Sequence, residues 1–341
     1  MRIAIVDDTI LVAEGLRRIV EESGEHNVIW MAHNGVEAVD LCHKDTPDLL
    51  LMDLIMPVME GVEATRLIMA SSPCPILIVS ASITKYAPQV FSAMGFGALD
   101  AVNTPSFSSE GSISDKDILL SKIDTIGKLA VENTPSKPRP MVSKLAATSR
   151  VLHQSKKPLI AIGCSAGGPQ ALQEILSCLP HDFPVPIVVI QHIDELFSND
   201  MSKWLDTHCA LEVRIANHLD SPQGGVVLLG GMSDHLVLNK SQRLEYTKDP
   251  MDLVYRPSVD VFFRSVIKYW DGDVTAMLLT GMGRDGSQGL LDCRDRGFYT
   301  IAQDEETSTV YGMPRAAAKL NAAVDIMPLN KIAEKLIELY C

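Results

Sequence analysis

Short apolar runs alternate with amphipathic stretches in the first part of the chain, and this alternation predicts buried strands connected by helices. The predicted strands span residues 2–6, 28–31, 48–52, 76–79 and 99–102. The predicted helices span residues 9–22, 35–43, 62–69, 87–94 and 116–131. Strand–helix units with short loops are typical of a doubly wound, five-stranded parallel sheet of the α/β class, whose functional site lies at the carboxyl ends of the strands.

A second α/β pattern, of the Rossmann-like kind, begins near residue 157. Its predicted strands span residues 159–162, 185–190, 226–229, 274–279 and 299–302, and residues 235–238 are expected to form a hairpin with 226–229. One predicted helix begins near residue 169, and two more span residues 261–269 and 289–295.

The segment between the two patterns, residues 132–156, is rich in Pro, Ser, Thr and Lys. This composition favours an extended, semi-stiff linker over a packed element. The sequence therefore predicts one domain over residues 1–131, a linker over 132–156 and a second domain over 157–341.

Charge, hydropathy and cysteine content argue against a nucleic-acid-binding protein, a membrane protein and a disulfide-bonded protein. A net charge of −13 over 341 residues argues against a nucleic-acid surface, because phosphate contacts need clustered Lys and Arg. No apolar run approaches the ~20 residues of a spanning helix, so no membrane insertion is expected. The seven cysteines are scattered and never spaced C-x-x-C, which favours reduced thiols in a cytoplasmic protein.

Acidic residues follow two of the predicted strands in the first domain. Asp7 and Asp8 follow the first strand, and Asp53 follows the third. Three such carboxylates would repel one another unless a hard cation shared them, and Mg²⁺ prefers carboxylate oxygens. A site of this kind also presents Asp53 as a nucleophile to a phosphoryl donor. Ser80 follows the fourth strand, where its hydroxyl is placed to bond an incoming phosphoryl oxygen.

In the second domain, the stretch Gly163-Cys-Ser-Ala-Gly167 joins the first predicted strand to a helix. It fits the G-x-S-x-G pattern, in which a sharp strand-to-helix turn exposes a nucleophilic hydroxyl, here that of Ser165. A glycine-rich phosphate loop or a plain tight turn fits the same residues, so the motif alone leaves these alternatives open. Cys164, a rival nucleophile, is expected to point to the opposite side and pack into the core.

An activated serine needs a base, and the base needs an acid that orients it. His192 directly follows a predicted strand, as Ser165 does, and is the first choice for the base, with His235 as a rival. Asp285 lies in a glycine-rich loop after another strand and is the first choice for the acid, with Asp304 as the alternative.

Residues 1–131 resemble a response-regulator receiver domain, chiefly through the run LLLMDLIMPVMEGVEATRLI and the acids at the strand ends. The resemblance implies that Asp53 is the phosphoacceptor, that Asp7 and Asp8 hold Mg²⁺ together with it, and that Ser80 is a switch hydroxyl.

The chain departs from the receiver pattern after the fifth strand. Thr104 stands where receivers usually carry a lysine, and Ala101 stands where they usually carry an aromatic switch residue. The departure leaves the metal and phosphoacceptor residues in place, but it removes the lysine that would pair with an aspartyl phosphate.

Residues 157–341 resemble the catalytic domain of the protein-glutamate methylesterases of bacterial chemotaxis systems. The resemblance rests on five motifs: IGCSAGGPQAL, VVIQH, PSVDVFFRS, LLTGMGRDG and TIAQDEETSTVYGMPRAA. A receiver in front of this domain is the architecture of the same family. The run LLLMDLIMPVMEGVEATRLIM further resembles the Wsp-type, surface-sensing branch.

The resemblance implies a phosphorylation-regulated hydrolase that removes methyl esters from glutamyl side chains on receptor helices in the cytoplasm, with glutamine deamidation as a second activity. Ser165, His192 and Asp285 match its catalytic motifs, and the backbone N–H groups of Ala166 and Met282 are the candidate oxyanion donors. Many members of the family carry threonine where this chain has Ala166. The partners implied are methyl-accepting receptors and a CheA-like histidine kinase; Mg²⁺ serves the receiver alone.

Three other functions are weighed against this one. A DNA-binding response regulator would need a basic helix-turn-helix, which the acidic second domain lacks. A nucleotide-binding enzyme would need a full G-x-G-x-x-G, and Gly163, Gly167 and Gly168 are wrongly spaced for it. The third alternative is an interaction protein whose receiver is a degenerate scaffold.

Overall fold

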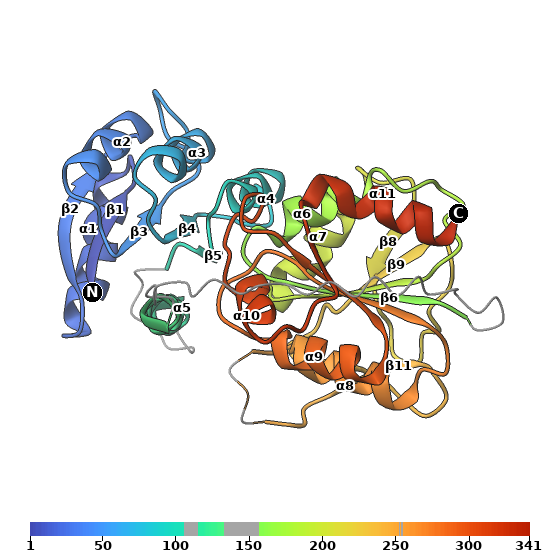
Figure 1. Cartoon of the computed structure of the whole chain (residues 1–341). Coiled ribbons are helices and arrows are strands. Elements are labelled where there is room, and N and C mark those ends of the chain that lie inside the picture. Colours follow the sequence, from blue (N-terminus) through green and yellow to red (C-terminus); the bar gives the residue numbers. More distant parts are fainter. Residues whose placement is uncertain (106–114, 133–156, 252, 254) are drawn as a thin grey trace.

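The computed structural model describes residues 1–105, 115–132, 157–251, 253 and 255–341. It contains two α/β units, one in the blue and cyan part of the chain and one in the green to red part (Figure 1). The predicted linker lies outside the described residues, apart from Glu132 at the end of a helix. None of the described helices is long and apolar enough to cross a bilayer.

The first unit is a five-stranded parallel sheet in the order β2-β1-β3-β4-β5, which confirms the predicted doubly wound fold. Its strands are β1 (Arg2–Val6), β2 (Asn27–Ala32), β3 (Leu49–Met52), β4 (Ile76–Ser80) and β5 (Asp100–Asn103). Its helices are α1 (Ile10–Glu22), α2 (Gly35–Lys44), α3 (Gly61–Ser71), α4 (Ala87–Gly95) and α5 (Asp115–Glu132). Buried Leu, Ile and Val side chains on both faces of β1, β3 and β4 explain why these strands are continuous apolar runs.

The second unit is a seven-stranded parallel sheet in the order β14-β13-β12-β6-β7-β9-β8. Its strands are β6 (Leu159–Cys164), β7 (Ile187–Gln191), β8 (Glu212–Ile215), β9 (Val226–Leu229), β12 (Val274–Leu278), β13 (Tyr299–Gln303) and β14 (Asp325–Met327). Its helices are α6 (Gly168–Leu176), α7 (Glu195–Asp206), α8 (Val259–Tyr269), α9 (Ser287–Arg296), α10 (Met313–Lys319) and α11 (Leu329–Tyr340).

The predicted hairpin between residues 226–229 and 235–238 is wrong. β9 is an internal strand between β7 and β8, whereas β10 (His235–Leu238) pairs antiparallel with β11 (Leu244–Thr247) in a separate two-stranded sheet. Leu236 and Leu238 of β10 are buried in the same core cluster as Phe262 and Phe263 of α8. Burial against this helix, which the local pattern does not reveal, places β10 outside the main sheet. The sequence analysis also left α7, β8, β11, α10, β14 and α11 unassigned, although α7 and α11 are amphipathic helices of 12 residues each.

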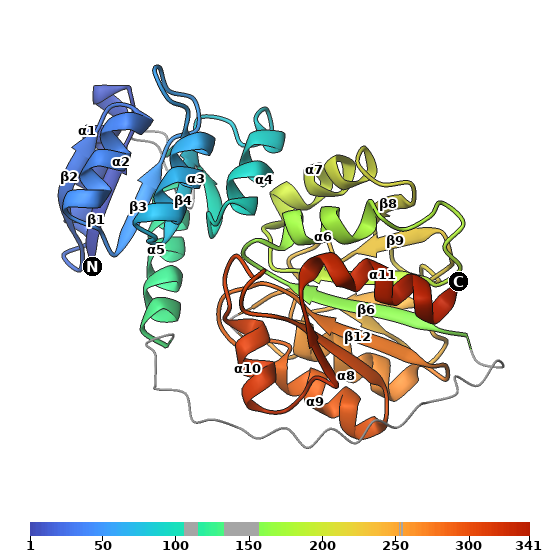
Figure 2. The ribbon, with the colours of Figure 1, turned by 45° about the horizontal axis from the view of Figure 1, so that its top comes forward.

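Helix α4 of the first unit packs against α6 and α7 of the second, and both views show it as the helix nearest that unit (Figures 1 and 2). Phe91 of α4 is fully buried and lies 5.5 Å from the ring of Trp204 on α7. Gly95, at the end of α4, leaves so little space that a Cβ there would lie 2.9 Å from the Cβ of Gln170 on α6. The two units therefore share a closely packed contact.

Candidate active site

Three neighbouring parallel strands place the catalytic candidates of the second unit. β6 pairs with β7 on one side, with Cys164 opposite Gln191, and with β12 on the other side, with Gly163 opposite Leu278. The loops after these strands therefore emerge side by side. Ser165 follows β6, His192 follows β7 and Asp285 lies in the loop after β12. In Figure 2 the arrowhead of β6 points to the side on which the receiver lies.

Glycines shape the turn that carries Ser165. Gly167 adopts a φ of +78°, a left-handed conformation that side chains disfavour, immediately before α6 begins. Gly163 lies so close to α8 that a Cβ there would come within 2.2 Å of a Val259 methyl group. Gly281, after β12, lies against the nucleophile, since its Cβ would be 2.8 Å from the Cβ of Ser165. Glycine is therefore required at Gly163 and Gly281 because neighbouring atoms leave no room for a Cβ, and at Gly167 because of its backbone conformation.

The structure joins two of the three catalytic candidates directly. His192 Nε2 lies 2.8 Å from Asp285 Oδ2, and both side chains are nearly buried. His192 Nδ1 is also buried and has no hydrogen-bond partner among the described residues. No direct hydrogen bond joins Ser165 to His192 in the described part of the chain, and Ser165 is 9 % exposed. Because Asp285 holds Nε2, the imidazole keeps Nδ1 as the nitrogen that can accept a proton.

The carboxylate of Asp285 is held by the start of α8. Its oxygens accept hydrogen bonds from the Ser258 hydroxyl at 2.8 Å and from the N–H of Val259 at 2.7 Å, with a longer one from the N–H of Asp260. Burial acts to raise the pKa of Asp285, but the hydrogen bond and charge of His192 and these donors outweigh it, so that the pKa is lowered overall. The acid is ionised and oriented.

His235 and Asp304, the alternative candidates for the base and the acid, make hydrogen bonds elsewhere in the structure. His235 is fully buried: its Nε2 bonds the carbonyl of Pro250 at 3.0 Å, and its Nδ1 accepts from the N–H of Ser258 at 3.1 Å. Both ring nitrogens are engaged in hydrogen bonds to the backbone, so His235 has a structural role and has no nitrogen available to act as a base. Asp304 accepts hydrogen bonds from the N–H and hydroxyl of Thr307, which closes its own loop.

Cys164 lies where the strand geometry predicts. It is fully buried, its Sγ points to the carbonyl of Ile190 at 3.9 Å, and burial raises the pKa of its thiol. A thiol in such surroundings is a poor nucleophile.

Both backbone positions predicted as oxyanion donors lie next to Ser165. Ala166 follows it directly, and Met282 follows Gly281, which touches Ser165. In the described part of the chain, no backbone carbonyl accepts a hydrogen bond from the N–H of Ala166 or of Met282. N–H groups without a backbone acceptor are the kind of donor that an oxyanion hole uses, so both positions stay candidates for that role.

Sequence reasoning missed three residues that organise the site. Gln191 is fully buried and donates from its amide to the carbonyls of Ser165 and His192, which ties the two loops together. Ser258 holds Asp285, and Tyr255 stacks on His192. The motifs VVIQH and PSVDVFFRS contain Gln191 and Ser258 and were the available signals for them. Tyr255 lies outside these motifs, and its contact with His192 depends on the tertiary structure.

In the first unit, the predicted acidic site at the strand ends has raised pKa values, in contrast to the lowered pKa of Asp285. Burial raises the pKa of Asp53 to about 7, with the charges of Asp7 and Asp8 adding to it against the N–H donors of Leu54 and Ile55. Burial also raises the pKa of Asp7 to about 6, and Asp8 adds to this effect. Carboxylates that are desolvated and repel one another are a donor set suited to a hard divalent cation.

The ligand atoms of Asp7, Asp8 and Asp53 are more widely spaced than those of a compact metal site among the described residues. Among the described residues, the trio that brings one ligand atom each within 4.8 Å is Glu25, His26 and Asp124, where His26 and Asp124 bind each other and join the start of β2 to α5. Mg²⁺ keeps several waters in its shell, so an open arrangement of carboxylates fits it. Ser80, which ends β4 and is buried, accepts on its carbonyl from the N–H of Thr104 at 2.8 Å.

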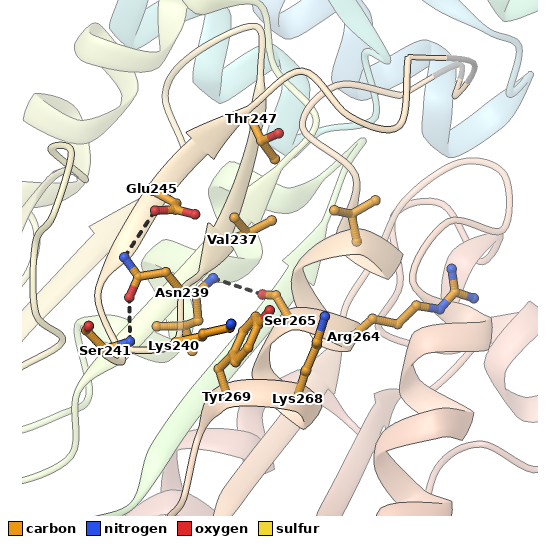
Figure 3. A pocket seen from close by; sticks show the side chains of 12 residues that line it. Val237, Asn239, Lys240, Ser241, Glu245, Thr247, Arg264, Ser265, Lys268 and Tyr269 are labelled. Carbon is orange, nitrogen blue, oxygen red and sulfur yellow. Dashed lines mark hydrogen bonds between the residues drawn. The ribbon is translucent and has the colours of Figure 1, made fainter.

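A groove of about 610 Å³ lies between the β10–β11 hairpin and α8 (Figure 3). It is lined by Lys240 and Glu245 from the hairpin segment and by Arg264 and Lys268 from α8. Arg264 is paired with Asp292 at 3.0 Å. No residue of the His192–Asp285 site lines this groove, so it is separate from that chemistry.

Removing the Ser258 hydroxyl tests the anchoring of Asp285. Ser258 also caps α8, so Ser258→Ala removes a helix cap worth about 1 kcal/mol and leaves a buried carboxylate one donor short, at a further cost of about 1–2 kcal/mol. Urea unfolding should show a loss of about 2–3 kcal/mol in the second unit. Asn34→Ala, which removes the cap of α2 and an exposed hydrogen bond to the Glu37 carboxylate, should cost the first unit about 1 kcal/mol. Equal losses for the two variants would contradict the anchoring role.

Each of the two units matches a known protein family. The family CheB methylesterase matches residues 160–336, and the response regulator receiver domain matches residues 3–110. A protein-glutamate methylesterase/protein-glutamine glutaminase of Mesorhizobium japonicum is 52 % identical over 340 residues, covering 99 % of this chain and 98 % of that protein. One from Pseudomonas fluorescens is 50 % identical and covers 100 % of this chain and 99 % of that protein.

Among solved structures, the crystal structure of the Thermotoga maritima CheB methylesterase catalytic domain is similar to the second unit. It is 34 % identical, covers 54 % of this chain and 99 % of that chain, and has a TM-score of 0.50. The fold, the family matches and the full-length relatives agree, and the chain belongs to the CheB methylesterase family, with an N-terminal receiver domain in front of its catalytic domain.

Proposed function

We propose that this chain hydrolyses γ-methyl esters of glutamyl side chains on methyl-accepting receptor proteins, with Ser165 as nucleophile, His192 as base and Asp285 as orienting acid. The His192–Asp285 pair at 2.8 Å, at the ends of strands that flank the one carrying Ser165, is the observation that carries the proposal. Relatives about 50 % identical over the whole chain carry the name of this activity.

The reaction follows from the geometry of the site. The Ser165 hydroxyl attacks the ester carbonyl while His192 Nδ1, the nitrogen that Asp285 leaves free, takes its proton. Asp285 stabilises the imidazolium that forms. The N–H groups of Ala166 and Met282 bind the oxyanion, with each such donor typically worth about 3 kcal/mol.

The tetrahedral intermediate collapses with loss of methanol, which receives the proton from His192. Water, deprotonated by the same nitrogen, then hydrolyses the acyl-enzyme and releases the glutamate carboxylate. A glutamine side-chain amide enters the same cycle with ammonia as the leaving group. The curated relatives are also named as protein-glutamine glutaminases, which favours this second activity.

The substrates and partners of the chain are proposed from its family. The substrates are the methylated helices of receptors in the cytoplasm, and the phosphoryl donor is a CheA-like histidine kinase. A cytoplasmic location is consistent with the unpaired cysteines. Assignment to the Wsp-type branch rests on the run LLLMDLIMPVMEGVEATRLIM alone.

Replacing the two neighbouring nucleophile candidates separates their roles. Ser165→Ala should lower methanol release from methylated receptor by at least about 10³-fold, because the attacking oxygen is lost. Cys164→Ser should change the rate less than three-fold if the protein folds, since its buried thiol lies away from the reacting atoms. Loss of activity in Cys164→Ser with activity kept in Ser165→Ala would reverse the assignment.

The receiver is proposed as the phosphorylation site that controls this activity. Asp7, Asp8 and Asp53 would hold Mg²⁺, and the Asp53 carboxylate would attack the phosphorus of the donor. When bound, the cation neutralises charge on the transferring phosphoryl group. The raised pKa values of Asp7 and Asp53 support the assignment, since burial desolvates both carboxyl groups and the neighbouring carboxylates raise the two pKa values further. The alternative of a degenerate scaffold predicts no transfer to Asp53.

Asp53→Asn should stabilise the receiver at alkaline pH. The pKa of Asp53 is about 7 in the folded protein and about 3.9 in an unfolded chain, so the folded state binds more protons between these values and stability falls as pH rises through them. This pKa difference corresponds to about 4 kcal/mol, so at pH 8 the variant should melt roughly 10–15 °C higher than the wild type, with a smaller difference near pH 6.

Mg²⁺ should close this gap by stabilising the wild type more than Asp53→Asn. Asp40→Asn, which removes an exposed receiver charge, serves as the control and should leave the melting temperature nearly unchanged. A wild type that melts above Asp53→Asn at pH 8 without Mg²⁺ would refute the destabilisation by the buried, ionised Asp53 carboxylate.

The receiver is proposed to hold the esterase in check through α4. The carbonyl of Gly95 lies 3.5 Å from the hydroxyl of Thr309, and Thr309 in turn lies against Gly167, two residues after the nucleophile. Phosphorylation at Asp53 would loosen this contact. Because Thr104 stands where receivers usually carry a lysine, we assign the response to Ser80, since its strand β4 is followed by α4 in the chain.

A bulky side chain at Gly95 should release the inhibition without phosphorylation. Gly95→Glu forces α4 away from Gln170, so the basal rate of methanol release should rise several-fold and respond less to a small phosphodonor with Mg²⁺. The neighbouring Phe96 is 42 % exposed, and Phe96→Ala should keep the wild-type basal rate. A basal rate that is unchanged in Gly95→Glu would show that α4 does not restrain the enzyme.

A further inference from the structure

The imidazole of His192 is flanked by an aromatic ring from a distant part of the chain. Tyr255 stacks on it with 4.3 Å between the ring centroids and 7° between the ring planes. Asp285 holds the edge of the same imidazole at Nε2. One contact therefore controls the rotation of the ring in its own plane, and the other controls the tilt of that plane.

Tyr255 lies in a segment that is tied down on both sides. The buried ring of His235 bonds the Pro250 carbonyl, before Tyr255, and the N–H of Ser258, after it. The guanidinium of Arg256 also bonds the carbonyl of Met251 within the segment. The stack is thus part of an anchored loop, and the anchor at Ser258 is the residue that also holds Asp285.

The two contacts leave a single nitrogen of the base available. His192 Nδ1 is buried and unbonded among the described residues, and Ser165 has no hydrogen bond to it in this structure. An imidazole that could tilt would move Nδ1 relative to the serine hydroxyl, and small displacements of a base lower the rate strongly. A ring face parallel to the imidazole opposes that tilt and also attracts the positive charge formed when the base is protonated.

We propose that Tyr255 is a positioning residue of the hydrolase, whose ring sets the plane of His192 so that Nδ1 faces Ser165. The inference rests on the proposed triad. The ring performs this task and the phenolic hydroxyl does not, because it is the ring face that meets the imidazole.

Three substitutions in the full chain test the proposal, with methanol release from a methylated receptor fragment as the assay. Tyr255→Leu removes the aromatic plane and should lower kcat about ten-fold with KM changed less than two-fold. Tyr255→Phe keeps the plane and should restore kcat to within about two-fold of the wild type. Tyr246→Leu is the matched control: it removes another partly buried tyrosine, which bonds Ala216 and Gly231, and should lower the melting temperature without lowering kcat ten-fold.

A second readout removes the receptor from the measurement. The rate at which a small fluorophosphonate labels Ser165 should fall in Tyr255→Leu by the same factor as kcat and recover in Tyr255→Phe. A raised KM with normal kcat and normal labelling would overturn the proposal and make Tyr255 a receptor contact. Equal damage in Tyr255→Phe and Tyr255→Leu would overturn it in favour of the hydroxyl.

Ser165→Ala, assayed alongside, separates this inference from the proposed triad. If Ser165→Ala still releases methanol, the triad and the positioning role both fail. If Ser165→Ala is inactive while Tyr255→Leu has the wild-type kcat and labelling rate, the triad stands and the positioning role alone is refuted.

Discussion

The buried carboxylate of Asp285 is the constraint around which the catalytic unit is built. A charge at this depth is tolerated only when it is paired and hydrogen-bonded, and it receives His192 on one side and the start of α8 on the other. To bring α8 so close, Val259 must pack against Gly163 and Gly286, where no Cβ would fit. The glycines, the helix and the base are thus parts of one arrangement.

The receiver also holds buried carboxylates, but with fewer compensating contacts than Asp285 has. Its acids are desolvated beside one another, and the pKa values of Asp7 and Asp53 are raised where that of Asp285 is lowered. A carboxylate that the protein compensates can orient a base at all times. Carboxylates that are only partly compensated suit the proposed cation and phosphoryl site, and their ionisation lowers the stability of the fold.

Contact between the units connects these two sites. α4 follows the strand that ends in Ser80, and its last residue, Gly95, reaches the loop that packs on Gly167. A close fit of this kind is sensitive to small movements, because packed interfaces shift between discrete arrangements. Such a contact makes the receiver suited to control access to Ser165 even with Thr104 in the place of the usual lysine.

The sequence by itself determined the strand–helix order of the first unit, its acidic strand ends and the placement of Ser165, His192 and Asp285 after strands, because period and punctuation are local properties. It could not decide that these loops adjoin, since the order β12-β6-β7 is a matter of strand pairing. Tertiary structure also decided that His235 has a structural role and that Tyr255 meets His192, because burial and stacking depend on partners far apart in the chain.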